Sequence, residues 1–222
     1  MPASNPTSPA PDSTARRRGG RPGRADTERL GAAILAAAEQ VFLAEGFGGA
    51  RMEAIAARAG TTKQTVYARF GSKEALFIEV SNGLLKERFA PVSAGQGTLR
   101  DALVQVADQM LAAMLDPRMV RMHCIITAEA ERFPELARMT DRDESFPGRS
   151  ILHALLTEAA ERGEIDCPDP HQAMLMLQHM VLAAPLRAAS LGLDTFDADA
   201  CRNWTRYAVD LFLDGARPRG AS

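Results

Sequence analysis

Residues 51–73 read RMEAIAARAGTTKQTVYARFGSK, and this stretch decides the fold of the first third of the chain. Two short amphipathic segments lie on either side of Gly60. The first, Met52 to Ala59, repeats apolar residues at spacings of three and four, which places them on one helix face. The second begins at Lys63, turns Val66 inward and leaves its polar side chains outside. The pattern predicts two short helices joined by a turn.

Three positions in this stretch have the spacing of a helix-turn-helix: Ala56, Gly60 and Val66. A small Ala lets the second helix cross closely, Gly supplies the unusual turn conformation, and Val packs between the two helices. A polar outer face with one tyrosine suits a helix that enters the major groove of DNA. A surface hairpin with solvated polar residues would satisfy the same three positions, so they leave both interpretations open.

The longer segment Thr27–Phe77 resembles the DNA-binding domain of the TetR family of bacterial transcription regulators. The matching pattern is ordered along the whole segment, so it is far more specific than a helix-turn-helix spacing alone. The resemblance implies that the chain binds DNA. It is carried by Ile34, Leu35, Ala38, Phe42, Gly46, Phe47, Ile55, Ala56, Ala59, Gly60, Thr65, Val66, Tyr67, Phe70 and the run Ser72–Phe77.

The resemblance also assigns base-contacting positions. Lys63, Gln64 and Thr65 occupy the leading end of the recognition helix, from which side chains reach base edges. Lys favours guanine and Gln favours adenine, so Lys63 and Gln64 are expected to pair with those bases. Thr62 is expected to be the N-cap of this helix, with its hydroxyl on a backbone N–H, although a helix start also suits a phosphate.

Four more positions are expected at the DNA backbone. Tyr67 and Lys73 match family positions that usually hold phosphates, and Arg69 is expected to contact either the backbone or a base. The chain departs from the family at Arg51, where Ser or Thr is usual at the start of the first helix of the motif. We expect that a helix cap is lost there and that a longer cationic phosphate contact replaces it.

Residues 1–25 form an arginine-rich arm that is expected to be disordered, because it is rich in Pro, Ser, Ala and Gly and lacks large apolar residues after Met1. Within it, Gly20-Arg21-Pro22 resembles the core of an AT-hook. Arg21 is therefore expected in the DNA minor groove, where the narrow groove concentrates negative potential. The alternative is a solvated tail that adds only attraction to phosphates.

Composition and charge agree with a DNA-binding front end. Net charge is −2 in 222 residues, but residues 1–80 carry 11 Lys+Arg against 8 Asp+Glu, whereas the remainder carries 15 against 20. The three cysteines contain no CxxC pair, so a disulfide framework or a zinc site is not expected. Because neither a signal peptide nor a membrane-length apolar run is evident, we expect a soluble, cytoplasmic protein without membrane contact.

Helix start and stop signals predict an all-α chain of about nine helices. No alternating β pattern is evident, and Pro185 is expected to kink the helix that contains it. The predicted domains are 26–72 for the helix-turn-helix, 73–215 for a ligand-binding and dimerisation body, and 216–222 for a flexible tail. Predicted helix starts follow Asp26, Arg51, Thr62, Ser72, Thr98, Asp116, Phe146, Asp169 and Asp197, and a short turn, PELARM, follows Phe133.

Methionines gather in the predicted body: eight of the ten fall between residues 110 and 180. Met is flexible and polarisable, so it suits a surface that accepts varied apolar shapes, but it is also common core filler. CIITAEAERFPELARM resembles the C-terminal domain of one TetR subset, and the family's use of this domain for small ligands favours a pocket. Candidate pocket residues are Phe89, Met110, Met114, Met122, Phe133, Phe146, Met176 and Met180.

The last two predicted helices are long and apolar. Resemblance to TetR proteins implies that they pair with the same helices of a second copy in a four-helix interface. A dimer also follows from the DNA side, because one short recognition helix contacts few bases and a two-fold protein matches a palindrome. Candidate interface residues are Leu175, His179, Leu182, Trp204, Tyr207, Ala208 and Leu211.

The sequence gives no sign of catalysis, cofactor or metal. His171 and His179 are eight residues apart, but spacing places no third ligand beside them, and no nucleophile elbow, HExxH or phosphate loop occurs. The expected function is therefore a homodimeric regulator, by family habit a repressor, that binds double-stranded palindromic DNA and responds to a small apolar ligand. Two alternatives stay open: an architectural DNA-binding protein with a filled core, and a small-molecule-binding or enzymatic body with secondary DNA contact.

Overall fold

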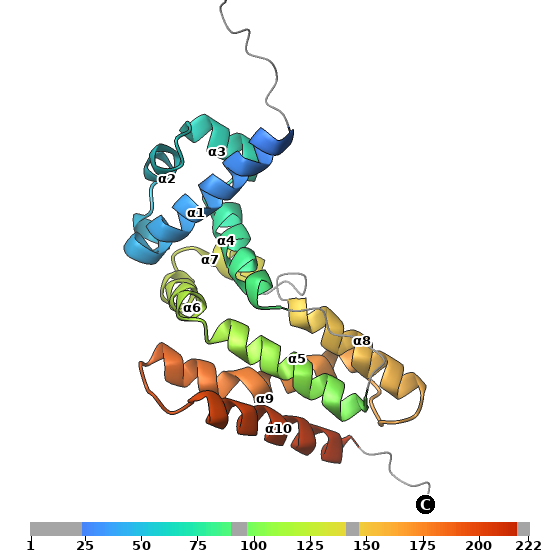
Figure 1. The fold of residues 1–222 in the computed structure, drawn as a ribbon. Coiled ribbons are helices and arrows are strands. Elements are labelled where there is room, and N and C mark those ends of the chain that lie inside the picture. Colours follow the sequence, from blue (N-terminus) through green and yellow to red (C-terminus); the bar gives the residue numbers. More distant parts are fainter. Residues whose placement is uncertain (1–23, 90–96, 141–146, 217–222) are drawn as a thin grey trace, which may run out of the picture.

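The computed structural model describes residues 24–89, 97–140 and 147–216, and within these residues it contains only helices (Figure 1). The all-α prediction is confirmed. There are ten helices rather than about nine, because Pro134 does not merely restart a turn but begins a seven-residue helix. Their bounds are α1 Arg24–Gly49, α2 Met52–Arg58, α3 Lys63–Phe70, α4 Lys73–Arg88, α5 Leu99–Met114, α6 Pro117–Glu129, α7 Pro134–Thr140, α8 Pro147–Glu161, α9 Pro170–Ser190 and α10 Ala198–Gly215.

Helix α1 starts earlier than predicted. Arg24 and Ala25 are helical, so Asp26 is not the N-cap but a first-turn residue whose carboxylate accepts from Arg29. Gly46, the residue at which the helix was expected to end, has φ 71°, a left-handed conformation that favours glycine, but it marks a kink inside α1, which continues to Gly49. The predicted arm of residues 1–25, including Arg21, otherwise lies outside the described residues.

By length and composition, α1 is the one helix among the described residues that is apolar enough to cross a membrane. No membrane-length apolar run was expected here, because many of the apolar residues of this helix are small alanines. Its large apolar side chains, such as Ile34, Val41 and Phe42, are buried against the rest of the protein. Core packing therefore accounts for the apolar character of α1.

The head, formed by α1–α3 and the start of α4, has an aromatic core. Phe42, Phe47 and Phe77 are fully buried, and Phe77 meets the other two edge to face at 4.9 and 5.5 Å between ring centroids. Phe133, from the connection between α6 and α7, reaches Phe47 at 4.9 Å. The prediction that Phe133 lines a ligand pocket is therefore not met, because its ring completes the head core.

In the body, α5 lies against α8, α9 and α10, while α6 lies between α9 and the head (Figure 1). The helix starts predicted from sequence carry local caps in this part of the structure. Thr98 and Asp101 form a capping box at α5, Asp116 caps α6, and Asp169 accepts from Gln172 N at the start of α9. Helix α9 continues beyond Pro185 to Ser190.

Candidate DNA interface and ligand cavity

The turn between α2 and α3 has the geometry that the three spaced positions predict. Gly60 adopts φ 67°, and Thr61 N donates to Ala56 O at 2.9 Å, which closes the turn. Val66 is fully buried and Ala56 almost so, whereas Phe70 is half-buried. The helix-turn-helix is therefore formed, with α3 presenting its polar side outward at the end of the head.

The start of α3 is capped as predicted. Thr62 Oγ1 accepts from Thr65 N at 3.2 Å and lies 2.9 Å from the Thr65 hydroxyl. Both hydroxyls are thus engaged with each other, and Thr65 is half-buried. The remaining backbone N–H groups of this first turn point outward from the helix start, which is the geometry that binds a phosphate.

Lys63 is paired within the motif. Its Nζ donates to Glu53 Oε1 on α2 at 2.7 Å and lies 5.7 Å from the centre of the Tyr67 ring. The hydrogen bond with Lys63 is the largest reason that the pKa of Glu53 is lowered, and the same bond raises the pKa of Lys63. Both groups are therefore charged at neutral pH. To contact a base, Lys63 must therefore leave Glu53 or donate to Glu53 and the base together.

Other predicted contact residues surround Lys63. Gln64 is exposed and so is Tyr67, at 39% of its surface. Arg69 is exposed but runs back along α1, where Gly31 leaves room for it: a Cβ at Gly31 would lie 2.8 Å from Arg69 Nε. Gln64 and Tyr67 thus face the outside of α3, while Arg69 lies at its junction with α1.

Lys73 has an internal role that the sequence analysis missed. Its Nζ donates to Phe47 O at 2.8 Å and to Ala50 O at 3.2 Å, and it lies 4.5 Å from the centre of the Phe47 ring. The side chain is half-buried. Lys73 therefore joins the start of α4 to the segment that ends α1, and its expected phosphate contact stays a prediction.

Arg51 occupies the N-cap of α2, and its side chain makes no capping hydrogen bond. This confirms the loss of the cap that the substitution for Ser or Thr implies. The side chain is exposed at the start of α2. Its contact with a phosphate remains a prediction.

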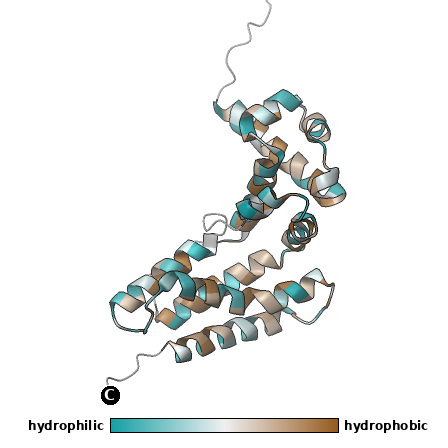
Figure 2. Cartoon of the chain, turned by 180° about the vertical axis from the view of Figure 1, so that it is seen from behind, coloured by the Kyte–Doolittle hydropathy of each residue, from teal (hydrophilic) through white to brown (hydrophobic). Residues whose placement is uncertain are grey.

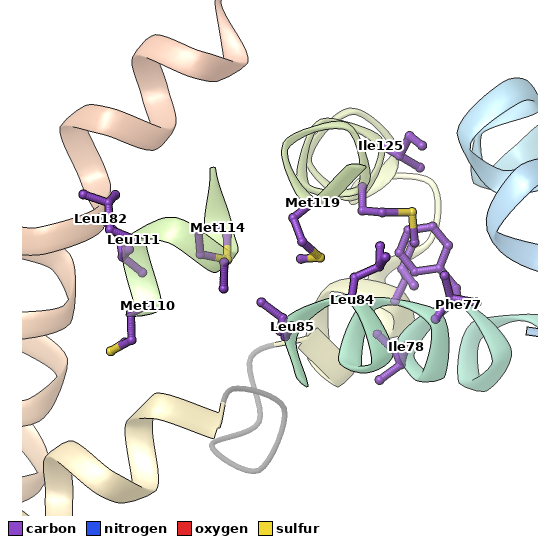
Figure 3. Packing of buried hydrophobic residues seen from close by; sticks show 14 of the residues in the cluster. Phe77, Ile78, Leu84, Leu85, Met110, Leu111, Met114, Met119, Ile125 and Leu182 are labelled. Carbon is purple, nitrogen blue, oxygen red and sulfur yellow. The ribbon is translucent and has the colours of Figure 1, made fainter. Parts of the chain in front are cut away.

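A cavity of about 640 Å³ lies between α4, α6 and α9, with the end of α5 and the start of α8 at its edge. Figure 3 shows Leu85, Met114 and Met119 pointing toward a common space. Its other large apolar wall residues are Ile78, Ile126, Leu182, Leu186 and Leu191. Its polar wall residues are Ser81, Asn82, His123, Thr127, Arg149, Gln178, His179, Arg187 and Ser190. The size and the apolar wall with a few polar groups are those of a small-molecule site.

Of the predicted pocket residues that the structure describes, Met114 alone lines this cavity. Met110 and Met122 are fully buried and act as core filler, the alternative that the sequence left open. Met176 points outward with 63% exposure, and Met180 is half-buried where its carbonyl accepts from Trp204. The spacing of residues along a helix shows which side chains share a face, but not which other helix that face contacts. The pocket assignments of these methionines failed for this reason.

The two remaining pocket candidates are phenylalanines. Phe89 packs beside Met110 and Gly148, since a Cβ at Gly148 would lie 2.9 Å from Phe89 Cζ. Phe146 lies outside the described residues. The wall residues of α4 were missed by the sequence analysis, although Ile78, Ser81 and Leu85 recur on one helix face and mix polar with apolar groups.

The predicted dimer residues differ in exposure and fall into three groups, buried, half-buried and exposed. Leu182 and Ala208 are buried within the protomer, and Leu182 and His179 line the cavity. Leu175 and Trp204 are half-buried, and Trp204 Nε1 donates to the carbonyls of Met180 and Val181 at 3.1 and 2.9 Å. Tyr207 and Leu211 point outward with 65% and 53% exposure. Leu182 and Ala208 are therefore not available for direct contact with a second copy.

Helix α6 joins the head to the body. Glu129 Oε1 accepts from Gly48 N at 2.9 Å, in the segment that ends α1. At the other end of α6, Arg118 pairs with Glu87 on α4 at 2.9 Å and with Glu39 on α1 at 3.4 Å. Hydrogen bonds to Asp116 and then to Glu87 raise the pKa of Arg118. Polar contacts at both ends of one helix thus connect the cavity wall to the head.

Comparison with known proteins identifies the class. A sequence model described as "Bacterial regulatory proteins, tetR family" matches residues 34–80, and one described as "AefR-like transcriptional repressor, C-terminal domain" matches residues 101–215. Together these matches span both the head and most of the body. The chain belongs to the TetR family and is a DNA-binding transcriptional regulator.

Relatives of similar length support this assignment. The transcriptional regulator RutR of Escherichia coli K12 is 28% identical over 207 residues, covering 84% of this chain and 90% of RutR. The transcriptional repressor NicS of Pseudomonas putida is 28% identical, covering 83% and 91%. The solved structure of the flavonoid-responsive regulator FrrA is 31% identical, covers 87% of this chain and all of FrrA, and superposes with a TM-score of 0.71.

Proposed function

We propose that this protein is a cytoplasmic, homodimeric repressor that binds a palindromic operator through α3 and is released by a small, largely apolar ligand in the body cavity. The observation that carries the proposal is the cavity of about 640 Å³ against α4, the helix that leaves the helix-turn-helix. The repressor assignment is supported by the repressors among its relatives. The flavonoid response of FrrA supports a small-molecule signal.

The DNA side of the proposal rests on the outer face of α3. Lys63, Gln64 and Tyr67 are exposed there, and Arg51 is exposed at the start of α2. Side chains at the leading end of such a helix contact base edges, while those at its flanks contact phosphates. The Glu53–Lys63 ion pair restricts the approach of Lys63 to the groove, so Glu53 also affects which base is accepted.

The dimer side rests on an apolar surface over α9 and α10. Met176, Tyr207 and Leu211 are each more than half exposed, and Figure 2 shows hydrophobic segments recurring along both helices. Exposed large apolar residues grouped on a monomer are typical of an interaction site. If this surface pairs with the same surface of a second copy, each of the two α3 helices would be positioned over one half of a palindrome.

Coupling between ligand binding in the cavity and the position of the DNA-binding head would pass through α4. Ile78, Ser81, Asn82 and Leu85 line the cavity from this helix, and Lys73, its first residue, is bonded to the head. A ligand that fits one position of α4 better than another shifts the spacing of the two recognition helices, whereas equal affinity shifts nothing. The cavity also weighs against the architectural alternative, which requires a filled core.

The test begins with selection of duplexes from random DNA, which should yield one palindrome. Compounds, including flavonoids, are then screened for release of that duplex by fluorescence anisotropy. Ala183 lines the cavity and is exposed, so Ala183→Trp should block the cavity, retain operator affinity and lose the response. Ala154→Trp, on the exposed face of α8 and away from the cavity, is the matched control and should respond normally.

Three results would contradict the proposal. Shallow sequence preference without a palindrome would favour the architectural alternative. Failure of every compound to release DNA, or equal release of wild type and Ala183→Trp, would remove the role of the cavity. A monomeric mass by light scattering at micromolar concentration would remove the dimer.

A further inference from the structure

The cavity is elongated along α9. Its wall on this helix runs from Gln178 to Ser190 through Leu182 and Leu186, successive residues four apart. Twelve residues of helix at 1.5 Å each correspond to about 18 Å. A ligand that fills this wall is therefore longer than it is wide, with polar groups available at both ends of the helix face.

One wall residue lacks a hydrogen-bond partner. Ser190 Oγ is buried and is the one buried side-chain nitrogen or oxygen among the described residues that makes no hydrogen bond. Buried hydroxyls are nearly always paired, because an unpaired one loses its interactions with water without replacement. Since Ser190 belongs to the cavity wall, a polar atom of a bound molecule would supply the missing partner.

Among the described residues of the cavity wall, the ionisable side chains are all basic. Among the described residues that line the cavity there are two arginines and two histidines, and no aspartate or glutamate. Arg187 lies three residues before Ser190, so the two side chains lie on neighbouring positions of one helix face. The polar end of the cavity at the C-terminus of α9 thus combines a hydroxyl donor with a guanidinium group.

We propose that the cavity binds an elongated organic anion. Its apolar body lies against Leu85, Leu182 and Leu186, and its acidic group accepts a hydrogen bond from Ser190 Oγ beside Arg187. A neutral compound would satisfy Ser190 but gain nothing from Arg187, and a cationic one would be repelled by the arginines. This inference rests on the proposed function of the cavity as a ligand site and adds the chemical class of the ligand.

The test uses two sets of probes that share a body and differ in charge. The first set is decanoate, 1-decanol and decylamine; the second is naphthylacetate, naphthylethanol and naphthylethylamine, whose alkyl amine is protonated at neutral pH. Isothermal titration calorimetry on the full chain should show the acid of at least one set binding about tenfold more tightly than its alcohol, and the amine more weakly still. Both bodies are included because the apolar wall residues do not distinguish a chain from flat rings.

Two variants locate the acidic group. Ser190→Ala and Arg187→Gln should each reduce affinity for the acid about tenfold while changing affinity for the alcohol less than about twofold. Arg121→Gln, on an exposed part of α6 outside the cavity, should bind all probes as wild type does. Ser190→Ala should also leave the melting temperature unchanged or raise it, because it removes an unpaired buried hydroxyl.

Several results would overturn the inference: equal affinity for acid and alcohol, preference for the amine, a preference for the acid that survives both variants, or no binding by either set. These outcomes are separable from failure of the proposed function. If acids bind but do not release the operator, the proposed function fails and the ligand class stands. If neutral or cationic compounds release the operator through the cavity, the proposed function stands and the ligand class fails.

Discussion

Lys73→Met removes the ammonium group that joins the start of α4 to the end of α1 and keeps most of the aliphatic stem. The variant loses hydrogen bonds to Phe47 O and Ala50 O, at 2.8 and 3.2 Å, and the contact 4.5 Å from the Phe47 ring. A hydrogen bond from a charged group contributes about 1.5–3 kcal/mol. Because Lys73 is half-buried and water replaces part of the loss, we expect the free energy of unfolding to fall by about 2–3 kcal/mol in total.

The assay is urea unfolding followed by circular dichroism at one fixed protein concentration, which matters because a dimer is stabilised by mass action. For a chain of this size the same loss corresponds to a fall of about 4–12 °C in the melting temperature. Lys86→Met, on the exposed side of α4, is the control and should unfold as wild type does. If Lys73→Met is within about 0.5 kcal/mol of wild type, the internal role of Lys73 is wrong and its charge serves DNA alone.

Three further substitutions test other parts of the structure. Thr62→Ala should lower stability by about 1 kcal/mol, measured by urea unfolding, because the N-cap of α3 is lost; no change would mean that the cap is dispensable. In the wild type, hydrogen bonds from Arg100 at 2.5 and 2.8 Å lower the pKa of Asp210, and Asp210→Asn breaks this ion pair. Its stability deficit should therefore be full near neutral pH and shrink as pH falls below the ordinary carboxyl pKa of 3.8, and a deficit that grows on acidification would contradict this. Burial lowers the pKa of His123 in the folded protein, so the unfolded chain takes up the proton first and wild type should lose stability as pH falls below the ordinary histidine pKa of 6.5. In thermal melts between pH 7 and 5, His123→Gln should lose less stability than wild type. Equal loss would exclude His123 as a source of the pH dependence.

Features fixed by local sequence were predicted well. The caps at Thr62, Thr98 and Asp169 depend on contacts within three residues, so the sequence contains the whole interaction. The turn at Gly60 depends on one left-handed position, which glycine marks plainly. The start of α1 was missed, because the helix extends two residues before the expected cap at Asp26.

Features that depend on distant segments were not predictable in the same way. The cavity arises where α4, α6 and α9 fail to fill the space between them, and no single helix records that. Met110 and Met114 share one face of α5, yet the first is in the core and the second lines the cavity. The Glu53–Lys63 pair and the bonds of Lys73 likewise join residues from different helices.

The central claim is that the outer face of α3 binds DNA, and one affinity measurement tests it directly. Lys63→Ala combined with Tyr67→Ala removes two exposed side chains from this face without touching Val66, which holds the motif together. Fluorescence anisotropy with the selected duplex should show a loss of at least about fiftyfold in affinity, with the helical content by circular dichroism unchanged. Retention of wild-type affinity by this double variant would contradict the assignment of α3 as the recognition helix.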